Sequence, residues 1–174
     1  MKFVYVFLTG ILLLGTQAEA QKVFGTRNGK ISFISPTDED VKATNNEVAS
    51  RLADNGQITF SALIKGFKFR YAEMQEHFND QYLESNKFPR ADFKGNIVNL
   101  KDVNFTKDGT YKVTVKGDLT MHGVTKNLTA NGTIEIKGGK PVASCKFVIL
   151  MKDFNVDASS ITEKVNVEVN CAFQ

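Results

Sequence analysis

Polar and apolar residues alternate with a period of two along much of this chain. Such alternation is typical of β-strands that turn one face to a core and the other to water. It is clearest in residues 111–121, where odd positions are apolar or Gly and even positions are Lys, Thr or Asp. His122-Gly123 then provides a turn, and residues 128–136 alternate in the same way. The two runs together predict a long β-hairpin.

Shorter alternating runs on both sides of this hairpin predict further strands. Their apolar or small positions are Ile31 and Phe33; Ile58, Phe60, Ala62 and Ile64; Ala91, Phe93, Gly95 and Ile97; Cys145, Phe147, Ile149 and Met151; and Val165, Val167, Val169, Cys171 and Phe173. Phe67 and Phe69 continue the second set with the opposite parity. Because one extra residue reverses the alternation of a strand, the switch at Lys65-Gly66 predicts a β-bulge.

The segment from Tyr71 to Ser85 lacks this alternation and contains several residues that favour helix. Met74, Phe78 and Tyr82 follow one another at intervals of four residues, so they would lie on one stripe of a helix. Pro89 comes shortly afterwards and is tolerated at the first residue of a strand. The pattern predicts one helix, or two short ones, inserted between two strands.

Seven or eight strands with one inserted helix and no βαβ rhythm predict an all-β, antiparallel barrel or sandwich. The strands are long, many near ten residues, which favours an up-and-down barrel of about eight strands. Such a barrel is just wide enough to hold side chains or one small ligand.

The first twenty residues have the organisation of a cleaved signal peptide. Lys2 precedes the apolar stretch Phe3–Leu14, and the small-residue triplet Ala18-Glu19-Ala20 follows. A membrane-spanning helix needs roughly 20 apolar residues, so the segment is short for an anchor. We expect cleavage after Ala20, export to the periplasm or medium, and a single mature domain over residues 21–174.

Charge and motif content argue against several classes of function. The 22 basic and 19 acidic residues give a net charge of +3 and are scattered, whereas a nucleic-acid surface needs a concentrated basic face. No catalytic or nucleotide-binding motif is present, and the two histidines, His77 and His122, cannot assemble a His-rich metal site. The sequence therefore predicts no catalytic residue, cofactor or metal, and His122 is expected to bond the backbone beside its turn.

Two motifs resemble a known family. The stretch Gly117-Asp118-Leu119-Thr120-Met121-His122-Gly123-Val124-Thr125-Lys126 is similar to the hairpin of the YceI-like, polyisoprenoid-binding proteins. Lys87-Phe88-Pro89-Arg90-Ala91-Asp92-Phe93-Lys94-Gly95 resembles the segment after that family's helix. The resemblance covers nearly all of residues 21–174, although residues 30–47 depart from the pattern. It implies a lipocalin-like barrel that takes a long isoprenoid or fatty chain into its lumen in the periplasm.

The aromatic residues of the predicted inner face have two interpretations: they fill a core, or they line a cavity. Small residues on the same face favour a cavity, because they leave volume unfilled; they are Ala62, Ala91, Gly95, Gly117, Ala130 and Gly132. The predicted ligand-binding residues, in the lumen and at its mouth, are Phe60, Ala62, Phe67, Phe69, Met74, Phe78, Tyr82, Phe93, Val113 and Val115. Lys68, Arg70 and Arg90 flank the helix and are candidates for a charged head group, with ordinary solvated side chains as the alternative.

These observations predict a non-enzymatic periplasmic protein that binds a long-chain lipid for transport, storage or scavenging. Two alternatives stay open: an enzyme acting on an isoprenoid lipid with His77 or His122 as base, and a packed, ligand-free structural or stress protein. The expected partner is a hydrophobic small molecule rather than nucleic acid. Transient membrane contact and a homodimer are both compatible with the sequence, which leaves the oligomeric state open.

Cys145 and Cys171 are the only cysteines and fall on the dry faces of two predicted strands. If Met151 lies opposite Val165 in an antiparallel pair, Cys145 lies opposite Cys171. Directly opposite Cβ atoms are about 4.5–5.5 Å apart, and a disulfide needs roughly 3.5–4.5 Å. A disulfide between them is therefore feasible, and two buried free thiols are the alternative.

Overall fold

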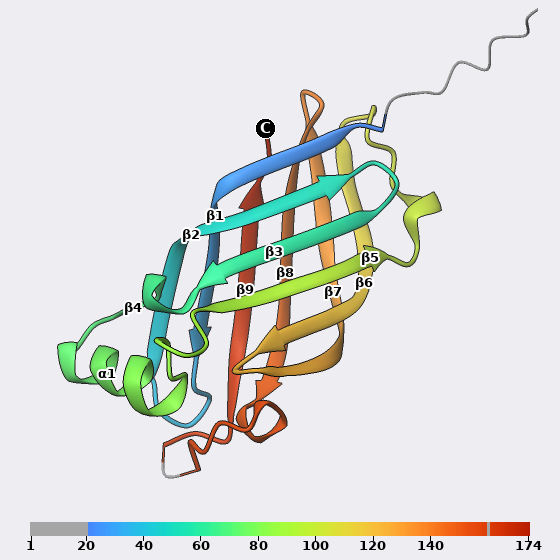
Figure 1. The fold of residues 1–174 in the computed structure, drawn as a ribbon. Coiled ribbons are helices and arrows are strands. Elements are labelled where there is room, and N and C mark those ends of the chain that lie inside the picture. The colour runs from blue at the N-terminus through green and yellow to red at the C-terminus, as the bar shows by residue number, and fades with distance from the viewer. Residues whose placement is uncertain (1–20, 160) are drawn as a thin grey trace, which may run out of the picture.

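The computed structural model describes residues 21–159 and 161–174, so the predicted signal peptide lies outside the described residues. Eight strands form a closed antiparallel barrel: β1 (Val23–Ile34), β2 (Lys42–Ala53), β3 (Gln57–Leu63), β5 (Arg90–Ile97), β6 (Gly109–Met121), β7 (Val124–Lys137), β8 (Lys140–Leu150) and β9 (Lys164–Ala172). Each strand pairs with the next one in the barrel, and β1 pairs with both β2 and β9, which closes the sheet (Figure 1). The predicted all-β, up-and-down barrel is confirmed.

The β6–β7 hairpin confirms the strongest alternation in the sequence. Its register runs from Gly109↔Ile136 to Met121↔Val124 without a break. His122 and Gly123 form the turn with φ values of 51° and 75°. Two consecutive positive φ values are typical of the tight turns whose twist matches that of the flanking strands.

The predicted bulge at Lys65-Gly66 is wrong, because the parity switches through a helical turn. The 3₁₀ turn η1 (Ile64–Gly66) ends β3, and the two-residue strand β4 (Lys68–Phe69) then pairs with β2 instead. Asn45 of β2 supports the turn from inside: its Nδ2 donates a hydrogen bond to the carbonyl oxygen of Leu63 at 3.0 Å.

Strand β2 was not predicted from the alternation, and two of its inward positions explain why. Asn45 and Ser50 are buried polar residues in a strand whose other inward residues are apolar. Both are satisfied: Asn45 Oδ1 accepts from the Glu47 amide at 2.9 Å, and Ser50 Oγ donates to the Thr59 carbonyl at 2.8 Å. Buried polar groups with partners cost little, but they hide the strand from a hydrophobicity pattern.

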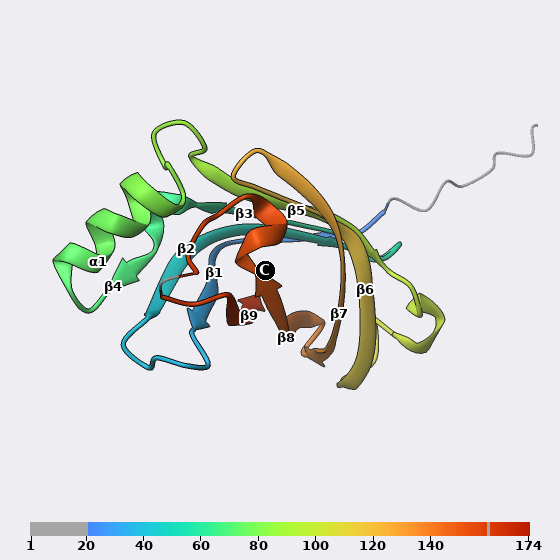
Figure 2. The same cartoon turned by 90° about the horizontal axis from the view of Figure 1, so that it is seen from below.

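The predicted helical insertion is confirmed as two short pieces, α1 (Ala72–His77) and a π-helical turn, η2 (Phe78–Tyr82). We call residues 72–83 the lid. Within the described parts of the chain, no helix is long and apolar enough to span a bilayer. Viewed from below, α1 lies beside β4 at the edge of one end of the barrel (Figure 2).

The two ends of the barrel differ. The end that carries the lid also carries the β6–β7 turn and the β8–β9 connection, which begins with the 3₁₀ turn η4 (Met151–Phe154) (Figure 1). At the opposite end, near η3 (Leu100–Asp102), the rings of Phe24 and Phe105 stack with centroids 5.9 Å apart, and Leu52 is fully buried. The interior is therefore packed at that end.

Candidate ligand-binding cavity

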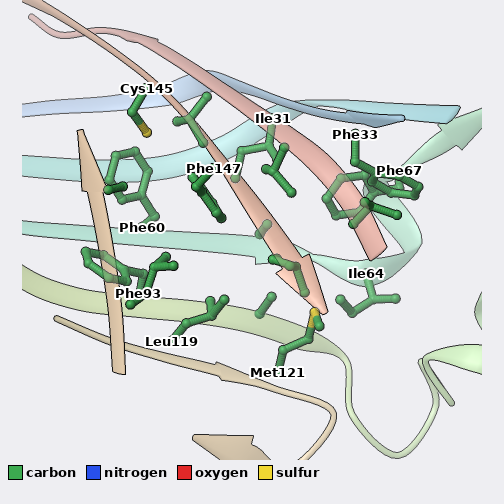
Figure 3. Close-up of a pocket in the computed structure, with 18 of the residues that line it drawn as sticks. Ile31, Phe33, Phe60, Ile64, Phe67, Phe93, Leu119, Met121, Cys145 and Phe147 are labelled. Atoms are coloured by element: carbon green, nitrogen blue, oxygen red, sulfur yellow. The ribbon is translucent and has the colours of Figure 1, made fainter. Parts of the chain in front are cut away.

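The barrel encloses an apolar cavity of about 220 Å³. Alternate residues of each surrounding strand face inward, as in other small barrels, and these residues form the wall of the cavity. Side chains from strands on all sides point into it (Figure 3). Those labelled in the figure are Ile31, Phe33, Phe60, Ile64, Phe67, Phe93, Leu119, Met121, Cys145 and Phe147.

All ten residues predicted for the lumen and mouth line this cavity. The alternation located those on the strands, and the four-residue spacing located Met74, Phe78 and Tyr82 on the lid. Residues of the same inward faces that were not selected also line it, notably Ile31, Phe33, Leu119, Met121, Leu128, Phe147 and Ile149. Extending the same alternation along β1, β6, β7 and β8 would have found them.

Two of the predicted small residues do not contribute open volume. Gly95 and Gly117 pair directly across β5 and β6 and are absent from the cavity wall. A Cβ on Gly117 would lie 2.3 Å from the carbonyl oxygen of Lys94, so glycine is needed there for close backbone approach. The other four, Ala62, Ala91, Ala130 and Gly132, do line the cavity.

Aromatic rings hold the lid against the barrel. The ring of Phe78 packs at centroid distances of 4.9 Å from Phe69, 5.7 Å from Phe33 and 5.8 Å from Phe67. Aromatic pairs at 4.5–7 Å contribute about 0.5–1.5 kcal/mol each beyond their area burial. Phe78 therefore joins the lid to β1, to β4 and to the residue before β4.

The three predicted head-group cations lie outside the cavity wall. All are exposed, and Arg70 lies 3.9 Å from an Asp40 carboxylate oxygen. Arg90 donates to Ser61 Oγ and lies 3.6 Å from Asp92, and Lys68 donates to the Lys65 carbonyl at 3.4 Å. These three cations are therefore surface residues, and the wall of the cavity is almost wholly apolar.

The two histidines have different surroundings. His77, on the lid, lines the cavity. His122 does not bond the backbone beside its turn as predicted: its Nδ1 donates to the Phe154 carbonyl at 3.0 Å, and its Nε2 lies 2.9 Å from Glu84 Oε2. Among the residues that the structure describes, no group of three or more His, Cys, Asp and Glu side chains could hold a metal ion.

The predicted register of the cysteines is wrong by two residues. Cys145 pairs with Val169 and Cys171 with Ala143, because β8 ends at Leu150 and Ile149, not Met151, lies opposite Val165. Both thiols are free. Burial raises the pKa of Cys145 to about 11 and that of Cys171 to about 12. Only Cys145 lines the cavity.

Comparison with known proteins identifies the family. The family model described as YceI-like domain matches residues 16–173. The chain belongs to the YceI-like domain family. A UPF0312 protein of Pseudomonas fluorescens is 28% identical over 138 residues, which are 79% of this chain and 55% of that protein. The chain thus spans about half the length of this curated relative.

Solved structures show the YceI-like fold despite low identity. A polyisoprenoid binding domain from Saccharophagus degradans, implicated in plant cell wall breakdown, is 11% identical with a TM-score of 0.74, over 87% of this chain and 97% of that one. BcnA of Burkholderia cenocepacia is 16% identical with a TM-score of 0.68, over 82% and 94%. The YCEI protein of Campylobacter jejuni is 15% identical with a TM-score of 0.54, over 100% and 99%.

Proposed function

We propose that this protein binds one long-chain lipid, a polyisoprenoid or a fatty-chain amphiphile, with its apolar chain inside the barrel. The observation that carries the proposal is the apolar cavity within a closed sheet, walled by aromatic and aliphatic side chains. Each buried methylene group contributes about 0.8 kcal/mol, so ten of them would contribute roughly 8 kcal/mol before the cost of association. The Saccharophagus degradans domain of the same fold, described as polyisoprenoid binding, supports this ligand class.

The polar end of such a lipid belongs at the mouth, since the interior offers almost no polar partner. Tyr82 and His77 of the lid border the cavity, and each combines an apolar ring surface with a polar atom. The cavity volume of about 220 Å³ is below the ~300–1,000 Å³ typical of small-molecule sites. A long chain therefore requires the barrel to widen at the mouth, where the lid and the β8–β9 connection lie.

We further propose that the protein works in the periplasm, as a carrier, store or scavenger of its lipid, after cleavage at Ala20. The charged, apolar and small-residue organisation of residues 1–20 supports export. An enzyme acting on an isoprenoid is the competing proposal, because His77 lines the cavity. Replacing His77 and His122 together and assaying chemical change of bound lipid would separate an enzyme from a carrier.

The native Cys145 thiol tests where the lipid binds. At pH 8 both thiols are neutral because their pKa values are raised, so N-ethylmaleimide should react slowly and faster as the pH rises toward 10, where more thiolate forms. Dansylated farnesol, a fluorescent isoprenoid alcohol, at ten times its Kd should slow labelling of Cys145 about elevenfold, because about one molecule in eleven remains free. Peptide mass spectrometry measures the rate at each cysteine.

Cys171 is the internal control, since it is buried but does not line the cavity. Because Cys171 is fully buried, it reacts only when the barrel opens, so its rate shows how far the lipid slows opening of the fold as a whole. If fluorescence shows saturation while Cys145 reacts at its lipid-free rate, the isoprenoid binds outside the barrel and the proposed function fails.

Lipid binding should also slow amide hydrogen exchange in the lid. A bound chain would contact Met74, Phe78 and Tyr82, so opening of residues 72–83 would require the loss of those contacts. Exchange measured by mass spectrometry should decrease there on addition of dansylated farnesol and remain constant around Leu100–Asp102, at the packed end. Equal exchange in the lid with and without bound isoprenoid would contradict its role at the mouth.

A further inference from the structure

The barrel wall is incomplete between β7 and β8. Their pairing runs from Lys137↔Lys140 only as far as Gly132↔Cys145, although β7 extends back to Val124 and β8 forward to Leu150. The mouth-side half of β7 is thus paired with β6 alone, and that of β8 with β9 alone. Inward residues of both unpaired halves line the cavity: Leu128, Ala130, Phe147 and Ile149.

Two segments meet at this part of the mouth. The first is η4 with the chain that follows it, where Met151 and Phe154 are buried; Met151, Ala158 and Ile161 line the cavity. The second is the end of the lid and the turn after it, where Leu83 is buried and lines the cavity. In the view from below, the β8–β9 connection crosses the opening between β7 and the lid side of the barrel (Figure 2).

His122, at the tip of the β6–β7 hairpin, bonds both segments. Its Nδ1 donates to the carbonyl oxygen of Phe154 in η4 at 3.0 Å, and its Nε2 lies 2.9 Å from Oε2 of Glu84, next to Leu83. The Phe88 ring packs edge-on against the imidazole at 4.7 Å. The side chain of His122 is only 10% exposed, whereas that of Glu84 is 41% exposed, so the imidazole is shielded while the carboxylate is partly in water.

The backbone is left-handed at one residue in each segment of this meeting point. Among the described residues, the non-glycine positions with positive φ are Glu84 at 43°, His122 at 51° and Asn155 at 55°. One belongs to each of the three segments that meet at the imidazole. The tight turn of the hairpin requires this conformation at His122, and Asn155 adopts it as the cap that ends η4.

Some buried polar atoms of the lid and of the turn after it lack hydrogen-bond partners in this closed state. Within the described chain, Gln75 Nε2, Asn79 Oδ1 and Ser85 Oγ are buried without a hydrogen-bond partner. An unpaired buried polar atom costs free energy that movement into water would recover. The lid is therefore docked by its aromatic rings and the turn after it by the contact between His122 and Glu84, while the unpaired polar atoms of both segments favour release.

We propose that His122 is a positioning residue for ligand exchange: it joins η4, which lies against β7 and β8, to the turn after the lid, and lipid enters or leaves when these contacts separate. The inference rests on the proposed function, because it assigns an entry route to the same cavity. Since His122 itself does not line the cavity, it acts on the rates of exchange rather than on the contacts of the bound chain.

Stopped-flow fluorescence with dansylated farnesol tests the route. His122→Ala should raise the rates of uptake and release together by about tenfold, the effect expected from losing one or two hydrogen bonds, with Kd nearly constant. Glu84→Gln removes the carboxylate from the other side of the contact and should give a smaller increase. Unchanged rates of uptake and release in folded His122→Ala would overturn the proposal. So would a higher Kd that results from faster release at an unchanged rate of uptake.

Asp118→Asn is the matched control, because Asp118 lies on the same hairpin and accepts from Asn127 at 3.1 Å, but on the exposed face. It should exchange lipid at the wild-type rate. Amide hydrogen exchange of the lipid-free protein is an independent second arm of the test. His122→Ala and Glu84→Gln should speed exchange in residues 83–88 and 151–156, and Asp118→Asn should not. If wild type binds no isoprenoid, the proposed function fails, and this second arm still decides whether His122 holds the two segments.

Discussion

Replacing Ala130 by Phe is expected to weaken binding of dansylated farnesol about a hundredfold. Ala130 is buried on β7 and lines the cavity, so the added ring occupies space that the lipid chain needs. Displacing about four methylene groups from the interior removes roughly 3 kcal/mol of binding free energy at ~0.8 kcal/mol each. Fluorescence titration gives Kd, and urea denaturation shows whether the variant is folded.

The matched control is Thr129→Phe, which adds the same aromatic ring at the neighbouring, exposed position of the same strand. It should bind the isoprenoid with wild-type affinity. Ala130 is preferable to Gly132 for this purpose, because a Cβ on Gly132 would lie 2.3 Å from the Ser144 carbonyl oxygen and strain the sheet. Wild-type affinity in a folded Ala130→Phe protein would contradict a lipid bound inside the barrel.

Replacing Phe78 by Ala should undock the lid and lower the free energy of unfolding by about 2–3 kcal/mol. A fully buried Phe→Ala substitution costs about 3–5 kcal/mol, and Phe78 is only half-buried, so we expect a smaller loss. The variant loses ring contacts with Phe33, Phe67 and Phe69 at once. Urea denaturation measures the loss, and hydrogen exchange should become faster throughout residues 72–83.

Tyr71→Ala provides the comparison, because Tyr71 precedes the same helix but is 45% exposed. Its effect on the free energy of unfolding should remain within about 0.5 kcal/mol, as for other surface substitutions. A Phe78→Ala protein with wild-type stability and wild-type exchange in the lid would show that the aromatic contacts do not hold it.

The barrel and the inward positions of its strands could be predicted because both follow from local alternation, whereas the expectation of a cavity rested on small inward residues and on the family resemblance. Phe60 and Phe93 were assigned to one interior from separate strands, and the structure pairs them across β3 and β5 with ring centroids 6.3 Å apart. The alternation fails where an inward residue is polar, and Asn45 concealed β2 for that reason. A helical turn also reverses parity, so η1 was taken for a bulge.

Contacts distant in sequence could not be predicted in the same way. His122 meets Glu84 across 38 residues and Phe154 across 32, and no local pattern specifies such partners. The cysteine register depended on the residue at which β8 ends, and the turn at Met151–Phe154 shortens the strand and shifts the pairing by two. Gly95 and Gly117 show that a small inward residue can serve backbone approach rather than open space.

Closure of the barrel through β1 has a consequence for how the chain folds. The first strand pairs with β2 on one side and with the last strand, β9, on the other, and Gly25 and Gln174 exchange backbone hydrogen bonds at 3.3 and 3.0 Å. The final ladder therefore joins segments separated by nearly the whole chain, and such non-local pairings slow folding. Until β9 arrives, the earliest strand has a free edge open to other chains. Truncation at the C-terminus should thus favour aggregation rather than a smaller folded barrel.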